Sequence, residues 1–435
     1  MSVLALSAVL APMNGTVAAA PVTTTTSATS PTATSTSGTG TNSSACLYKQ
    51  SPPPAEDGAE QPAPGVAAPS PLPVPTDPIG GSQLGGCGWV LPSDSTAKLP
   101  PSEVNAASWV LADLDTGQIL AAKDPHGRQR PAALVKVLLA MVALTELKPS
   151  TPVLAVAEDV DSARNTAKIG IAPGAKYTVD QLVRAMLMRP GNDVPHALAR
   201  AVGGPTGGVQ KALQKMNDLA AKMGALDTRI ITPTGLDGPG MSTSAYDLAL
   251  IYRHAIQLPA FAEAQAAKSV TLGGTVIRNS DPLMTSFPGA IAGITSNTTN
   301  AHWTNLSAAT RNGRRLVTVL LRMDQEQNAS YRQAAKLLDY GFDLSGAAVH
   351  PVGNLVDNAP PQSLGPTKPS TTGTEAVGST HNDAAGSGPM FDAFGNVGMP
   401  LTVVAGVVVL VALAMYLRKR RIRAARAKMS ASIPH

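Results

Sequence analysis

The 435-residue sequence is poor in aromatic residues, which make up only 3% of it, and in charged residues, which make up 14%. Proline and glycine are abundant instead, with 37 and 39 copies, and they gather with threonine and serine near the two ends of the chain. Such tracts bury too little apolar surface to offset the entropy that is lost on folding. A folded core is therefore expected only in the middle of the chain.

The middle of the chain also lacks a basic surface. The formal net charge is +5, but seven basic residues and no acid lie between Arg418 and Lys428. Subtracting these seven charges from +5 leaves about −2 for the rest of the chain. Nucleic-acid binding is excluded as the function, because it needs a basic face on the folded part.

Signals for a metal or a cofactor are missing as well. The seven histidines show no H-x-x-x-H or H-E-x-x-H spacing, and the two cysteines form no cluster. The sequence contains neither a phosphate loop nor a dinucleotide fingerprint. We therefore expect no metal and no cofactor.

Both ends of the chain carry signals for export and membrane anchoring. Residues 1–20 hold a short apolar run with an Ala-rich site, similar to a secretory leader without its basic start. Residues 397–417 are apolar and uncharged, and the basic residues 418–435 after them mark the cytoplasmic side. We expect a single-pass cell-membrane protein with an extracytoplasmic folded domain and a cytoplasmic tail. A hydrophobic leader without function and a buried core helix are the alternatives.

The two cysteines, Cys46 and Cys87, lie in a proline-rich segment that precedes the expected core. Two cysteines in an exported chain most often form one disulfide, which constrains the unfolded chain by about 3–4 kcal/mol. Free thiols are the alternative. We expect residues 21–102 to be an exported Thr/Ser/Pro-rich segment with this bridge, and residues 343–396 to be a flexible linker.

The core, expected over residues 103–342, contains both strand and helix patterns. Apolar runs on either side of Asp115–Gly117 predict a hairpin, and a run of Ala, Leu, Val and Met from Pro131 predicts a buried helix. Further helices are predicted over 174–190, after 191, over 206–223, after 244 and over 327–340, and strands near 269–278, 289–296, 302–309 and 315–322. This order predicts an α+β sandwich, similar to the β-lactamases and transpeptidases, whose antiparallel sheet lies between helices.

The predicted buried helix carries one charged residue, Lys136, which requires a partner in apolar surroundings. Its first residues, PAALVK, resemble the P-A-S-x-x-K motif of the serine D-alanyl-D-alanine carboxypeptidases, the low-molecular-mass penicillin-binding proteins. The resemblance covers about residues 103–342 and includes the stretches TPTGLDGPGMSTSAYDLALIYR and GAIAGITSNTTNAHWTNL. The proline-rich head and single C-terminal span are most similar to mycobacterial-type members.

In that family the serine of the first motif attacks the terminal D-Ala carbonyl, and the lysine one turn later takes its proton. The resemblance places Ala133 at the nucleophile position and Lys136 at the general-base position. In the second motif, S-x-N, Pro190 stands at the serine position and Asn192 is retained. Acylation through residue 133 is therefore excluded, because alanine has no side-chain oxygen.

The third motif, K-T-G, lies in the family on an edge strand along which the substrate binds. The resemblance places Ile294, Thr295 and Ser296 there, so the lysine and the glycine are lost. It also implies that the oxyanion hole consists of the main-chain N–H groups of Ala133 and Asn297, which do not depend on side chains. Weak binding of a D-Ala-ending peptide is therefore still expected.

We interpret the chain as a catalytically inactive member of this family in peptidoglycan metabolism, which binds the stem peptide or cell-wall enzymes. One alternative is an active carboxypeptidase that trims pentapeptide stems through a nucleophile outside the motif, such as Ser296. Another alternative is a membrane-tethered scaffold without a peptidoglycan ligand. Covalent labelling by a penicillin would separate the active enzyme from the other two.

Overall fold

The computed structural model describes residues 47–94, 98–324, 327–346 and 349–360. The expected leader, membrane span and cytoplasmic tail lie outside these residues, as do Cys46 and most of the expected linker. Among the residues described, no helix is long and apolar enough to cross a membrane. Cys87 is disulfide-bonded.

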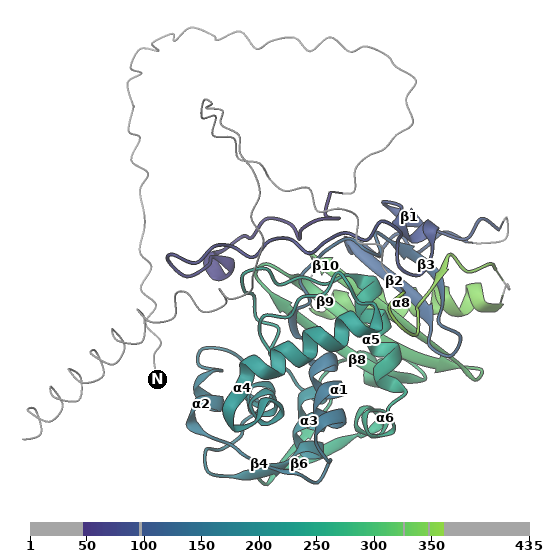
Figure 1. Ribbon diagram of the computed structural model, residues 1–435. Coiled ribbons are helices and arrows are strands. Elements are labelled where there is room, and N and C mark those ends of the chain that lie inside the picture. Colours follow the sequence, from purple (N-terminus) through teal and green to yellow (C-terminus); the bar gives the residue numbers. More distant parts are fainter. Residues whose placement is uncertain (1–46, 95–97, 325–326, 347–348, 361–435) are drawn as a thin grey trace, which may run out of the picture. The chain divides into compact units, whose positions relative to one another are not determined.

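A seven-stranded antiparallel sheet forms the centre of the fold (Figure 1). Its order is β1–β3–β2–β10–β9–β8, and β11 also pairs with β3. Its strands are β1 (Trp89–Val90), β2 (Ser108–Asp113), β3 (Gln118–Lys123), β8 (Ala290–Thr298), β9 (His302–Arg311), β10 (Arg314–Met323) and β11 (Gly353–Asn354). Two antiparallel two-stranded sheets lie apart from it, namely β4 (Pro152–Leu154) with β5 (Lys176–Thr178), and β6 (Ser269–Leu272) with β7 (Thr275–Arg278).

Helices cover both faces of the sheet, as the ribbon in Figure 1 shows. They are α1 (Lys136–Glu146), α2 (Ala157–Asp161), α3 (Val179–Met188), α4 (Asp193–Met223), α5 (Ala245–Ile256), α6 (Pro259–Ala266), α7 (Leu283–Ser286) and α8 (Gln327–Gly346). Short 3₁₀ helices are η1 (Gly58–Glu60), η2 (Ser82–Gly85) and η3 (Ala132–Val135).

The two cores follow from the alternation of side chains along each strand. Val110 and Ala112 of β2 are buried in the larger core with the side chains of α1 and α5. Trp109 and Leu111, between them in sequence, are buried in the second core with the side chains of α8. The predicted α+β architecture, with an antiparallel sheet between helices, is confirmed.

The packed core extends beyond the expected bounds of 103–342 on both sides. Ile79 and Leu84 of the proline-rich segment, and Val352 and Leu355 after α8, are buried in the larger core. β1 and β11 add to the sheet by pairing with β3. The composition of these segments did not indicate this packing. β1 and β11 pair with β3 through the main chain, and strands of two residues are too short to show an alternating side-chain pattern.

Two predicted elements differ in detail from the structure. The run at 269–278 is two strands, β6 and β7, because Gly273 and Gly274 turn the chain at positive φ. The helix expected over 206–223 is the second part of α4, whose backbone is non-helical at Gly204 and Gly208.

The predicted helix that ends before Pro190 is α3, and the side chain of Thr178 caps its N-terminus.

Candidate active site

The first motif begins at a strained turn that leads directly into the buried helix α1. Ala132 has φ of 47°, which residues other than glycine rarely adopt. Its carbonyl oxygen packs against Gly235, where an added Cβ would lie only 1.9 Å from that oxygen. Glycine at 235 is therefore required by this close approach, and the loop around it supports the turn before Ala133.

Ala133 lines a pocket at the position expected for the nucleophile, and it presents a methyl group there. Its main-chain N–H donates to Ser296 Oγ at a distance of 3.3 Å. This N–H is the first expected oxyanion donor. The hydroxyl of Ser296, which stands at the glycine position of the third motif, therefore already accepts the Ala133 N–H.

Lys136 is only 3% exposed, although it is the first residue of α1. Its Nζ donates to the main-chain oxygen of Gly191 at 2.7 Å. Burial lowers the pKa of Lys136 to about 8, and the charge of Asp193 offsets part of this shift. The expected partner is thus a carbonyl of the second motif, and this contact joins the first two motifs.

The second motif lies in the turn before α4 and is held by its neighbour in sequence. Asn192 is the N-cap residue of α4, but its side chain makes no capping hydrogen bond. The buried carboxylate of Asp193 accepts N–H groups from residues 169, 170 and 171 at 2.7–3.1 Å. Pro190 is exposed and offers no hydroxyl to the pocket.

The third motif lies on β8, the last strand in the order of the sheet. Ile294 packs against the larger core, on the side of the sheet where α1 lies. Ser296 is on the same side, because side chains two residues apart share a face of a strand. Thr295 faces the other way, where its hydroxyl donates to Asp281 Oδ2 at 2.6 Å and accepts from Asn305 Nδ2 at 2.9 Å. Asn297 is exposed.

The pocket between the three motifs is small. It encloses about 30 Å³, against roughly 300 Å³ or more in typical small-molecule sites. Its lining consists of Ala133, Lys136 and residues 186–190, 279–281 and 293–295. Burial raises the pKa of the Asp281 carboxyl, against the hydrogen bond from Thr295. Ile294 therefore stands where the third motif has a lysine and Asp281 adds a carboxyl to the pocket, while Lys136 and Arg189 are the cations of its lining.

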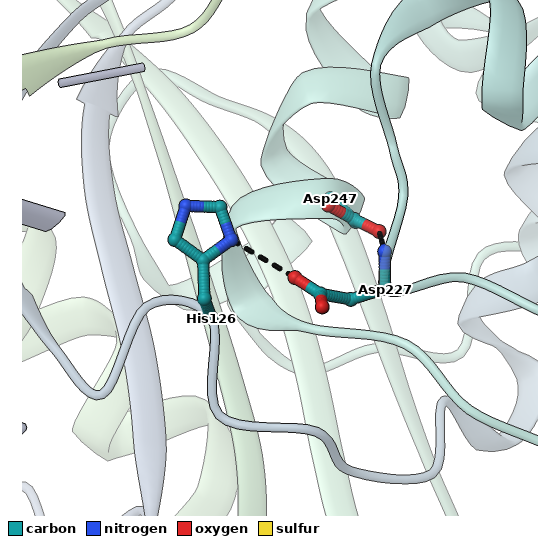
Figure 2. A group of neighbouring side chains, drawn as sticks. All are labelled: His126, Asp227 and Asp247. Atoms are coloured by element: carbon teal, nitrogen blue, oxygen red, sulfur yellow. Dashed lines mark hydrogen bonds and ion pairs between the residues drawn. The ribbon is translucent and has the colours of Figure 1, made fainter. Parts of the chain in front are cut away.

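A group with metal-ligand chemistry lies outside this pocket, and it consists of His126, Asp227 and Asp247 (Figure 2). Their ligand atoms lie within 4.8 Å of one another. Both ring nitrogens of His126 are hydrogen-bonded, and the guanidinium of Arg128 contacts Asp227 at 3.1 Å. A cation would have to displace these contacts beside a positive charge, so the group is arranged for hydrogen bonding.

Asp193, Gly235 and Asp281 were not singled out from the sequence. An acid at the first position of a helix favours that helix, so Asp193 carried a usable signal. Gly235 and Asp281 carried none, because the contacts of Gly235 with Ala132 and of Asp281 with Thr295 arise only in the folded chain.

Comparisons with known proteins agree with this arrangement. Residues 94–325 match the family profile Peptidase_S11, described as D-alanyl-D-alanine carboxypeptidase. D-alanyl-D-alanine carboxypeptidase DacB2 of Mycobacterium tuberculosis is 40% identical over 258 residues, which cover 58% of this chain and 87% of that protein. D-alanyl-D-alanine carboxypeptidase DacD of Escherichia coli is 32% identical over 252 residues, which cover 55% and 64%.

Solved structures show the same similarity. A crystal structure of a D-alanyl-D-alanine carboxypeptidase from Mycobacterium tuberculosis has a TM-score of 0.56 and 38% identity, and covers 61% of this chain and 99% of that one. Penicillin-binding protein 5 from Haemophilus influenzae has a TM-score of 0.52 and 27% identity, and covers 57% and 73%.

Proposed function

The chain belongs to the D-alanyl-D-alanine carboxypeptidase family of peptidoglycan metabolism, and from this premise we propose that it is a catalytically inactive member that acts by binding. Residues 397–417 would anchor it in the cell membrane, with the folded domain facing the cell wall. The apolar run and the basic residues after it support this location. The stem peptide of peptidoglycan, or enzymes that act on it, would be the partners.

The methyl group of Ala133 is the observation that carries this proposal. It lies in the pocket one turn before a buried lysine, where covalent catalysis needs an oxygen. In a comparable serine hydrolase, loss of the nucleophile alone costs on the order of 10⁶ in kcat. Within the described residues, the amine of Lys136 donates to the Gly191 carbonyl, and no hydrogen bond joins it to a hydroxyl.

Binding without chemistry is consistent with what remains around the pocket. β8 has β9 on one side, and in the described part of the chain no strand pairs with its other side. An extended peptide could add there through main-chain hydrogen bonds. Ile294 supplies no charge for a terminal carboxylate, and Ser296 occupies the Ala133 N–H. Affinity for a D-Ala-ending peptide is therefore expected to be low.

Labelling with a fluorescent penicillin tests the loss of catalysis. The full chain should give no covalent band, because an acyl bond needs the missing oxygen. The Ala133→Ser variant is the matched control, since it restores only that oxygen. A covalent band on the natural chain would overturn the proposal.

Titration with purified muropeptides tests the binding part separately. Weak, saturable binding by the unlabelled chain is expected. If the chain binds no muropeptide while remaining folded, the membrane-tethered scaffold without a peptidoglycan ligand becomes the better explanation.

The position of Ser296 favours a second candidate function, an active carboxypeptidase whose nucleophile lies outside the first motif. Its Oγ lies beside the Ala133 N–H, near the place where an attacking oxygen would stand. Release of D-Ala from a pentapeptide by the full chain, abolished in both Ser296→Ala and Lys136→Ala, would establish this activity. Absence of release in the natural chain excludes it.

A further inference from the structure

The proline-rich segment that precedes the carboxypeptidase-like domain packs against that domain. We call residues 47–88 the proline-rich strap; it is drawn in purple and blue in Figure 1 and contains little regular structure beyond η1 and η2. Ile79 and Leu84 bury their side chains in the larger core. The rest of the strap is held mainly through main-chain oxygens, which are accessible because proline has no N–H to pair them in a ladder.

Arg128 binds the strap at two places that are distant in sequence. Its side chain is 1% exposed, and it donates to the main-chain oxygens of Gln50 and Leu72 at 2.6 Å and of Pro73 at 2.9 Å. Its Nε donates to Asp227 Oδ1 at 3.1 Å. A buried cation thus closes the strap into a loop and is itself balanced by one carboxylate.

His126 makes the next contact with the strap, and it shares the same carboxylate. Its Nε2 lies 3.0 Å from the main-chain oxygen of Ile79. Its Nδ1 lies 2.9 Å from Asp227 Oδ2, and Figure 2 marks this second contact with a dashed line. A carbonyl oxygen only accepts, so Nε2 must carry a hydrogen. Nδ1 then bonds an ionised carboxylate only if it also carries one. The two hydrogen bonds together therefore require a ring that is protonated on both nitrogens beside an ionised Asp227. This pair holds one proton more than a neutral ring beside the same carboxylate.

Asp247 closes the group from α5. Its Oδ2 accepts the N–H of Asp227 at 2.8 Å and the hydroxyl of Thr228 at 2.7 Å, whereas its buried Oδ1 has no partner in the structure. An oxygen buried without a donor is less costly on a neutral carboxyl than on a charged one. The geometry therefore favours a neutral Asp247 beside a charged Asp227.

We propose that the proline-rich strap is docked by a proton lock, in which one proton held between His126 and Asp227, beside the buried carboxyl of Asp247, completes the bond from His126 to Ile79. Loss of that proton leaves the neutral ring able to satisfy only one of its two partners. The charged carboxylate of Asp227 is the stronger acceptor, so the ring keeps its hydrogen on Nδ1 and the strap loses the hydrogen bond at Ile79, while its contacts with Arg128, Arg130 and Asn300 remain.

The electrostatic surroundings agree with this arrangement. Burial alone would lower the pKa of His126, but the hydrogen bond and charge of Asp227 outweigh it, so that this pKa is raised. Burial and the charge of Asp227 raise the pKa of Asp247 to about 8. Burial would raise the pKa of Asp227, but His126 and Arg128 outweigh it and lower this pKa, so the shared proton resides on the ring.

The other groups that face the ring complete the description of the lock. The ring of Tyr246 lies 4.5 Å from that of His126, and burial raises the pKa of this phenol, so it stays neutral. Lys49 and Asp124 line the small cavity beside the ring. A histidine with a raised pKa contributes stability at low pH and loses it as the pH rises through that value. The strap is therefore expected to loosen on the alkaline side.

The strap also reaches the candidate active site at its other contacts. Glu60 forms an ion pair with Arg130, three residues before Ala133, and the side chain of Asn300 in the turn after β8 binds the N–H of Glu56 and the carboxylate of Asp57. Undocking would remove supports from the elements that carry Ala133 and Ser296. The strap therefore couples the proton lock to the shape of the pocket.

Hydrogen exchange measured by mass spectrometry on the full chain between pH 6 and pH 9 tests the lock. After correction for the intrinsic exchange rate, protection of strap peptides should fall by up to about tenfold per pH unit between the ordinary pKa of histidine and the raised pKa of docked His126, and should not fall further above it. In Asp227→Asn the amide can donate to a neutral Nδ1 and still accept from Arg128, so protection should no longer depend on pH. His126→Ala should lose protection at every pH.

A matched control is available in the same chain. His196 lies 2.9 Å from Asp159 beside Arg200, which is the same trio of residue types, but among the described residues it makes no hydrogen bond with the strap. His196→Ala should leave the pH dependence of the strap unchanged. Strap protection that is constant over this range in the natural chain would overturn the proposal. If His126→Ala does not fold, a pH dependence that persists in Asp227→Asn below the pKa of Asp247 would overturn it too.

Discussion

Ser296 Oγ lies 3.3 Å from the main-chain nitrogen of Ala133 and accepts its N–H. The two residues are 163 positions apart, and β8 brings them together by turning Ser296 toward η3. The missing nucleophile and the missing glycine of the third motif are thus coupled in space. A hydroxyl at 296 satisfies a donor that would otherwise face a developing oxyanion.

Restoring the nucleophile is expected to show this coupling. Ala133→Ser should be labelled slowly by a fluorescent penicillin, and Ala133→Ser with Ser296→Gly should be labelled faster by on the order of 10², which is the worth of one oxyanion donor. The acylation rate measures this effect. Ser296→Gly alone should give no label, and equal rates for the two serine variants would contradict the role of Ser296.

Lys136 should make the stability rise with pH above its own pKa. Burial lowers this pKa from 10.5 to about 8, so between these values the unfolded chain binds a proton that the native chain does not. The free energy of unfolding should increase across this window relative to Lys136→Met, by up to about 3 kcal/mol. Urea denaturation of both proteins at several pH values measures the difference. A constant difference would show that the amine stays charged in the fold.

Asp193 should be among the most important polar side chains of the site. It accepts three main-chain N–H groups, and Asp193→Ala leaves all three without this acceptor, two of them on the buried residues Ile169 and Ile171. The expected cost is at least about 3 kcal/mol in the free energy of unfolding. Asp161→Ala is the control, because its ion pair with Arg164 at 2.7 Å is exposed and should contribute less than about 1 kcal/mol. Similar costs for both variants would contradict the assignment.

The sequence predicted the parts of the fold that have a repeating pattern. The hairpin before Pro131, the helix capped by Thr178 and the strands after 289 all bury one regular face, and they are confirmed. Of the predicted motif positions, Ala133, Lys136, Pro190, Ile294 and Thr295 line one pocket, whereas Asn192, Ser296 and Asn297 are not part of its lining. Each of these signals lies within a short window of sequence.

Contacts made through the main chain could not be predicted in this way. Arg128 recognises the strap by carbonyl oxygens, which every residue has, so no side-chain pattern marks residues 50, 72 and 73. The partner of Lys136 is also a carbonyl, and only the fold shows that it belongs to Gly191. Low aromatic content made the strap resemble a linker, although two of its aliphatic side chains reach the core.

Gly235 should be required for the shape of the active-site turn, and a second glycine provides the comparison. Both Gly235 and Gly274 have positive φ, of 86° and 85°, so alanine meets the same backbone strain of about 1 kcal/mol at either place. At 235 the new Cβ would also lie 1.9 Å from the Ala132 oxygen, whereas at 274 nothing lies within 4 Å. Gly235→Ala should therefore cost several kcal/mol more than Gly274→Ala in urea denaturation, on the order of 3 kcal/mol. Made together with Ala133→Ser, it should also slow labelling by penicillin, while Gly274→Ala should not. Equal stability of the two alanine variants would show that η3 moves freely away from the loop.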